Sequence, residues 1–222
     1  MFIWGFLGVP FFFYNIMPFP TTNATQELPA INQILSSCGQ APVTSLDQTN
    51  PDVAIAYDTL LQVSREVQAE GWTFNKEYHY EFTPDNDDQI LIPSNILQIK
   101  LTENSANMDK DGVRRSGKLY DRHNHTYDWT DETVECDIVW EFDWVDLPQP
   151  IQDFIVARAA TYVSQRIVGD SAQYQMLQQQ EAYMRALALE YETQQGQFTF
   201  FGHPQGHTNY YQSYQPFHAL SR

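Results

Sequence analysis

The spacing of apolar residues changes twice along this chain of 222 residues, and these changes constrain the fold. Over residues 25–71 and 148–195, apolar residues recur every three or four positions, which is typical of amphipathic helices. Over residues 72–147 apolar and polar residues alternate, which is typical of half-buried strands. We therefore predict an α+β fold: a bundle of about four helices with a small antiparallel β-sheet inserted in the middle of the sequence.

The first two predicted helices carry clear end signals. The first covers residues 25–38, and Gly39 can supply the left-handed residue that follows many helices. The second begins after Asn50, whose side chain can cap the first free amides, and Pro51 fits the first helical position. It runs to about residue 70, before a glycine.

The last two predicted helices form the second half of the bundle. The third covers residues 150–168, and the fourth begins at Asp170 or Ser171 and runs to residue 195. Gln178–Gln180 in the fourth helix is either solvated or faces another subunit. The spacing predicts one inward face on this helix, made of Tyr174, Leu177, Glu181, Met184, Leu187, Ala188 and Tyr191.

The middle of the chain contains several short segments of strand character. Turn-forming residues such as Asn, Asp, Gly, Pro and Ser separate these segments, for example at Asp111-Gly112. Short strands joined by tight turns pair in an antiparallel manner. The predicted strands are residues 72–82, Ile90–Ile92, Ile96–Leu101, Lys118–Arg122 and Thr133–Phe142.

The charge of the chain is strongly negative and unevenly distributed. Lys and Arg number 12 and Asp and Glu 28, a formal charge of −16. This balance disfavours a protein that binds nucleic acid through a basic face, because such a protein neutralises phosphates with Lys and Arg. Residues 1–26 and 194–221 contain no charged side chain, so a charged middle lies between two neutral, aromatic-rich ends.

The most acidic segment is the candidate functional surface. It contains no Lys or Arg between Asp128 and Asp153. A solvated acidic surface is one interpretation. A pair of carboxylates in a glycosidase-like site is the other, although among 28 acids some pair meets any distance requirement by chance. The candidate residues are Asp128, Asp131, Glu132, Glu135, Asp137, Glu141, Asp143 and Asp146.

The two neutral ends are predicted to be an N-terminal arm, residues 1–24, and an aromatic, Gln-rich tail, residues 196–222. Residues 1–17 are very apolar, but Pro10 interrupts them and they are shorter than a bilayer span. They also lack the basic start of a signal peptide. We favour an arm docked on a neighbouring chain over a segment buried in its own core, a membrane-active segment, or translation starting at Met17.

No motif in the sequence predicts a metal, a cofactor or a catalytic centre. His123 and His125 could share one face of a strand and bind a metal, but a third ligand is missing. Residues 107–112 resemble the start of a calcium loop, but a lysine stands where that loop needs its bidentate glutamate. Cys38 and Cys136 lack the spacing of a redox or zinc site, so we predict structural free thiols.

Four short segments, in order, resemble the tail tubular protein A family of short-tailed bacteriophages. Ile34–Val43 resembles the family's opening "IL-x-x-IG-x-x-PV", with Cys38 in place of isoleucine. Gly71–Asn75 is similar to its "GWxFN" junction, and Leu119–Arg122 to its "YDR" strand. Leu147-Pro148 matches the start of its third helix. The resemblance covers residues 27–191, so it implies nothing about the arm and the tail.

This resemblance implies a structural virion protein without catalysis or cofactor. Family members form a ring of about twelve copies that joins the portal protein to the tail nozzle, tail tubular protein B. Tail fibres attach near that junction, and genomic DNA passes through the lumen without sequence-specific binding. The implied location is the virion tail, after assembly in the host cytoplasm, with no membrane partner. The alternative is a virion-associated, glycosidase-like hydrolase that acts on the host envelope.

An acidic lumen would suit this role. Lys and Arg contacts to phosphate would hold a duplex that has to move, whereas carboxylates repel it within about 8 Å at physiological salt. We therefore expect part of the acidic segment to face the lumen or rim of the ring.

Overall fold

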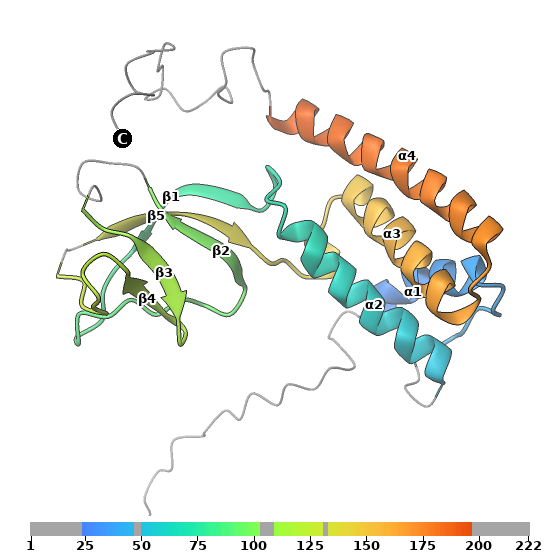
Figure 1. Ribbon diagram of the computed structural model, residues 1–222, viewed down its shortest axis with the longest axis horizontal. Coiled ribbons are helices and arrows are strands. Elements are labelled where there is room, and N and C mark those ends of the chain that lie inside the picture. Colours follow the sequence, from blue (N-terminus) through green and yellow to red (C-terminus); the bar gives the residue numbers. More distant parts are fainter. Residues whose placement is uncertain (1–23, 47–49, 103–108, 131–132, 197–222) are drawn as a thin grey trace, which may run out of the picture.

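A computed structural model describes residues 24–46, 50–102, 109–130 and 133–196 of the chain. It confirms the predicted α+β fold, with the helices gathered at one end of the molecule and the strands at the other (Figure 1). The predicted arm up to residue 23 and the predicted tail from residue 197 lie outside the described residues.

Helix α2 (Pro51–Gln68) begins where the sequence predicts. Asn50 Oδ1 accepts a hydrogen bond from the backbone N–H of Asp52 at 3.1 Å, and Pro51 occupies the first turn, where no amide donor is needed. These two residues therefore reduce the number of unpaired backbone amides in the first turn of the helix. Its body is stabilised by burial, because one face of the helix packs into the bundle.

Helix α3 (Gln149–Ile167) is the centre of the bundle. It packs against α1 (Ala24–Ser37), α2 and α4 (Ser171–Gly196), and Figure 1 shows it between α4 and the other two helices. A helix with neighbours on several sides needs apolar or small residues around most of its circumference, and α3 has them. Apart from Trp72, the largest buried side chains of the bundle core are Ile31, Ile34, Leu35, Tyr57, Leu60, Ile151, Phe154 and Ile155.

A three-stranded antiparallel sheet has the order β1-β5-β2, with β1 (Lys76–Phe82), β5 (Val134–Trp140) and β2 (Ile96–Leu101). The central strand β5 arrives last in the sequence, so the sheet cannot close until the chain returns from the β3–β4 region. The alternation predicted for β5 holds, because Val134, Cys136 and Ile138 are buried. They share a second apolar core with Phe82, Ile90, Ile92, Ile96, Leu101, Leu119 and Trp129.

A separate hairpin pairs β3 (Gly112–Arg115) with β4 (Lys118–Asp121). The sequence did not predict β3, because Gly112 indicated a turn and four residues with one apolar side chain show no alternation. The tight turn at Ser116-Gly117, both with positive φ, creates the strand by bringing it onto β4. The predicted strand Ile90–Ile92 is reduced to one isolated bridge from Leu91.

The segment Gly71–Asn75 joins the bundle to the sheet. The Asn75 side chain is fully buried, and its Nδ2 donates to the carbonyl oxygens of Gln68 at 2.9 Å and Trp140 at 2.8 Å. Its Oδ1 accepts from the backbone N–H of Trp72 at 2.8 Å. One side-chain amide thus satisfies three backbone groups, one each from α2, the connection and β5. These bonds explain why an asparagine ends the Gly71–Asn75 segment.

Candidate functional site: the acidic segment and helix α4

The described acids of the candidate surface lie at both ends of β5 and on the strand itself. Asp128 is exposed before the strand, and Asp143 and Asp146 are exposed after it. Since β5 has seven residues at roughly 3.3 Å each, about 20 Å separates the two ends. The candidates Asp131 and Glu132 lie outside the described residues.

The two acids on β5 take part in the sheet's own interactions. Glu135 Oε2 lies 2.9 Å from His79 Nδ1. Asp137 Oδ1 accepts hydrogen bonds from Thr102 Oγ1 at 2.9 Å and from the backbone N–H of His79 at 3.2 Å. Both side chains are half-buried, so they hold the bulged edge strand β1 to β5 instead of forming an open acidic surface.

Two acids that follow β5, Glu141 and Asp143, border a groove of about 460 Å³ between α2 and the connection to α3. Leu60, Leu61, Phe142 and Trp144 contribute its apolar part. The acidic part comes from Glu141 and Asp143 with Glu27 and Asp58, and Arg65 lies 3.5 Å from Glu141. Carboxylates therefore dominate the charge of the groove, and its chemistry suits cationic and not anionic groups.

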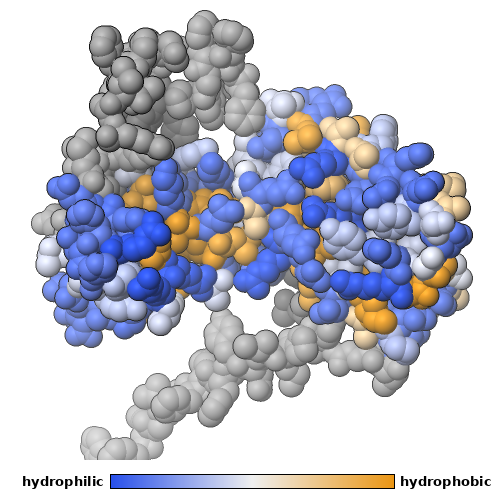
Figure 2. Space-filling view, viewed as in Figure 1, coloured by the Kyte–Doolittle hydropathy of each residue, from blue (hydrophilic) through white to orange (hydrophobic). Residues whose placement is uncertain are grey.

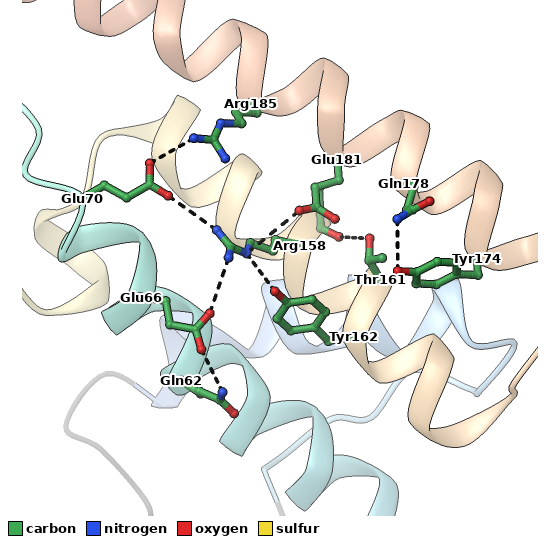
Figure 3. Close-up of polar contacts among 11 residues, drawn as sticks. Gln62, Glu66, Glu70, Arg158, Thr161, Tyr162, Tyr174, Gln178, Glu181 and Arg185 are labelled. Atoms are coloured by element: carbon green, nitrogen blue, oxygen red, sulfur yellow. Dashed lines mark hydrogen bonds and ion pairs between the residues drawn. The ribbon is translucent and has the colours of Figure 1, made fainter.

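A half-buried arginine connects three helices (Figure 3). Arg158 of α3 lies 3.6 Å from Glu66 on α2, 3.5 Å from Glu70 in the turn after α2, and 4.0 Å from Glu181 on α4. Its Nε donates to the Tyr162 hydroxyl at 3.3 Å. The sequence analysis assigned Arg158 no role, although a lone arginine at an apolar position of the helix was the available signal.

Electrostatics favour the charged form of Arg158. Burial alone lowers the pKa of the guanidinium, but the Tyr162 hydroxyl and the carboxylates of Glu66 and Glu181 together outweigh burial, so the pKa is raised. Arg185 of α4 also pairs with a carboxylate of this network, because it lies 3.4 Å from Glu70. This network orients α4 on the bundle, because it matches charges on α4 with charges on α2 and α3.

The face predicted to point inward on α4 is the one that packs on the bundle. Ala188 is fully buried, and Leu177 and Met184 are half-buried, as are the other predicted residues Tyr174, Glu181 and Tyr191. Leu187 is the exception, because it is 38% exposed and lies on the side of the exposed Tyr183 and Met176. The spacing of apolar residues therefore identified the packed face of α4 and placed one residue at its edge wrongly inward.

The histidines considered as metal ligands lie in a turn, and the two cysteines lie in the interior of the protein. His123–His125 lies in the turn after β4 instead of on a strand, and within the described ranges no three His, Cys, Asp or Glu side chains are placed to hold a metal. Cys38 and Cys136 are buried free thiols. Among the described helices, none is long and apolar enough to cross a membrane.

Comparisons with known proteins place the chain among viral tail components. The family model described as tail tubular protein matches residues 28–198, which include all the described strands and almost all of the helical bundle. Tail tubular protein A of Klebsiella phage KP34 is 27% identical over 164 residues, which are 74% of this chain and 85% of that protein.

The charged and buried polar groups described above join helices to helices and strands to strands, and with these matches they define a structural protein of the virion tail, not an enzyme. The chain belongs to the tail tubular protein family. The expected family and virion location are therefore confirmed, and the hydrolase alternative is set aside.

Proposed function

We propose that this chain is the adaptor of a short-tailed phage: a ring of about twelve copies between the portal protein and the tail nozzle, with fibres attached near the nozzle junction. The observation that carries the proposal is the family match across residues 28–198, because it extends over both cores. The name of the relative, tail tubular protein A, agrees with a component of a tube.

The charge of the chain supports a channel role for the ring. Twelve copies at −16 each make a strongly negative assembly, which a DNA duplex can pass without being held by phosphate contacts. The exposed acids Asp128, Asp143 and Asp146 are the described candidates for the lumen or rim. The half-buried Glu135 and Asp137 are weaker candidates, because they already bond within the sheet.

The mass of the purified chain in solution tests the proposal, measured by light scattering with and without the portal protein. A closed ring has twelve times the mass of one 25.8 kDa chain. A particle of that mass, or monomers that assemble only on the portal, is the expected result. A stable monomer that does not bind the portal would contradict the adaptor role.

A further inference from the structure

Helix α4 places its charged and apolar residues in the reverse of the usual order for a surface helix. Met176 is 71% exposed and Tyr183 is 61% exposed, and Leu187 accompanies them. With about 100° of rotation per residue, these three side chains lie within roughly 40° of one another and form one stripe. Figure 2 shows apolar residues reaching the surface over α4 among hydrophilic ones.

Three of the four charged residues of the helix point to the other side, and the fourth, Glu190, follows the stripe toward the end of the helix. Glu181 pairs with Arg158, and Arg185 pairs with Glu70 (Figure 3). Glu192 accepts hydrogen bonds from the backbone N–H of Thr73 at 2.9 and 3.1 Å and from its hydroxyl at 2.9 Å. These three charged residues lie roughly 140–180° around the helix from the stripe.

The resulting outer face of α4 is neutral. Between Ser171 and Leu189, Glu181 and Arg185 are the charged residues of the helix. Glu181 pairs with Arg158 of α3, and Arg185 pairs with Glu70 in the turn after α2. The exposed positions on the outward side are apolar, small or amide side chains. They are Ala172, Gln175, Met176, Gln179, Gln180, Ala182, Tyr183, Ala186 and Leu187.

We infer that this outer face of α4 packs against a second copy of the chain in the assembled tube. Charge favours that occupant: copies that each carry −16 repel one another, so a face without charged residues is where two copies meet at the lowest electrostatic cost. The α4 face is such a surface on an otherwise acidic molecule. The inference rests on the proposed ring and specifies one side of its repeated contact.

The area of the α4 face is smaller than that of a standard interface, so other residues must contribute to the same contact. The neutral part of the helix, Ser171–Leu189, is about 28 Å long, so a strip about 10 Å wide covers roughly 280 Å², about a third of the roughly 800 Å² per partner in a standard interface. In a ring each copy offers two different patches to its two neighbours. The α4 strip is therefore the centre of one patch, and it meets a different surface of the next copy.

Substitution of the stripe tests the contact in the full-length protein. In the double variant Met176→Glu, Tyr183→Glu, like charges would be placed in the contact, and we expect self-association measured by light scattering to weaken at least tenfold. Leu91→Glu is the matched control, because Leu91 is also 61% exposed but lies in the β region. Circular dichroism and Tm of the variants should match the wild type, because none of these side chains is buried.

A photoreactive benzophenone amino acid at position 183 identifies the occupant, with position 91 as control. Crosslinks at the mass of two copies support the inference. Crosslinks within one copy to residues 197–222, or to the portal or nozzle protein instead of a second copy, overturn it.

The two levels of the proposal fail in different ways. If the wild type assembles and the double variant assembles equally well, the α4 contact is wrong while the ring stands. If the wild type stays monomeric with and without the portal, the ring and the α4 contact are both wrong.

Discussion

Gln68 and Phe142 exchange two hydrogen bonds across 74 residues of sequence. The Gln68 side chain donates from Nε2 to the Phe142 carbonyl at 3.1 Å and accepts from the Phe142 N–H at 2.7 Å. The Gln68 side chain thus bonds to the Phe142 backbone as a neighbouring strand would. It provides partners for the N–H and carbonyl just beyond the end of β5. This reciprocal pair and the Asn75 amide connect the helical bundle to the sheet.

We expect Gln68→Ala to destabilise the protein by about 2 kcal/mol, because the N–H and carbonyl of the half-buried Phe142 would lose their partners. Gln62→Ala on the same helix is the control, since Gln62 is exposed, and it should cost less than about 0.5 kcal/mol. Urea unfolding measures both. Equal losses in the two variants would show that the Gln68 pair contributes nothing specific.

Substitutions of Gly71 and Gly39 allow the cost of backbone strain to be distinguished from the cost of a steric clash. Both have positive φ, +79° and +75°, but a Cβ on Gly71 would lie 3.3 Å from Val139 Cγ2, whereas one on Gly39 meets nothing within 4 Å. Gly39→Ala should cost about 1–2 kcal/mol from the left-handed conformation alone. Gly71→Ala should cost roughly 1 kcal/mol more, because Val139 must also shift. Thermal unfolding of both variants measures which one loses more stability. A larger loss for Gly39→Ala than for Gly71→Ala would contradict the prediction.

The buried carboxylate of Asp121 should make stability depend on pH. Burial raises the pKa of this group, but hydrogen bonds from the backbone of Asp111, His123 and Asn124 and from the Asn124 side chain together lower it below its ordinary 3.8. A group with a lowered folded pKa stabilises the protein above its unfolded pKa, and that contribution disappears as pH falls through the folded pKa.

Asp121→Asn should therefore reduce stability at neutral pH and flatten the loss of stability between pH 5 and the acid limit. Asp87→Asn, in an exposed turn, is the control and should leave the pH profile unchanged. Urea midpoints across a pH series measure the profile. A profile for Asp121→Asn parallel to that of the wild type would show that this carboxylate does not couple to folding.

Neither native thiol should react at neutral pH in the folded protein. Burial, with a smaller contribution from the neighbouring Asp137 charge, raises the pKa of Cys136 to about 12, and burial also raises the pKa of Cys38. Leu91→Cys adds an exposed thiol as a positive control. A colorimetric thiol reagent should label that added residue at once and the two native ones only after unfolding in urea. Rapid labelling of Cys136 in the native wild type would contradict its burial.

The exposed acids test the proposed lumen. The triple variant Asp128→Lys, Asp143→Lys, Asp146→Lys should slow DNA ejection at low salt, because lysines on the lumen wall would attract phosphates. Glu77→Lys, Glu81→Lys, Asp87→Lys changes the net charge equally at other exposed positions and should leave ejection unaltered. Ejection kinetics from particles assembled with each variant decide the matter, and identical kinetics would remove these acids from the lumen.

Sequence periodicity placed most elements within about two residues of their observed bounds. The expected helix over residues 25–38 corresponds to Ala24–Ser37, and the one starting after Asn50 to Pro51–Gln68. Local chemistry was sufficient there, because caps and apolar spacing act over a few residues. The strand Gly112–Arg115 was missed, because its strand state depends on pairing with β4.

Helices, strands and overall α+β class were thus determined by the sequence itself, because side-chain spacing decides which surface each element can bury. Only the tertiary structure decided how Gln68 meets Phe142, that Glu135 and Asp137 are engaged within the sheet, and that Arg158 pairs with carboxylates on α2 and α4. The physical reason is the same in each case. These outcomes depend on partners far away in the sequence, which no local pattern of side chains identifies.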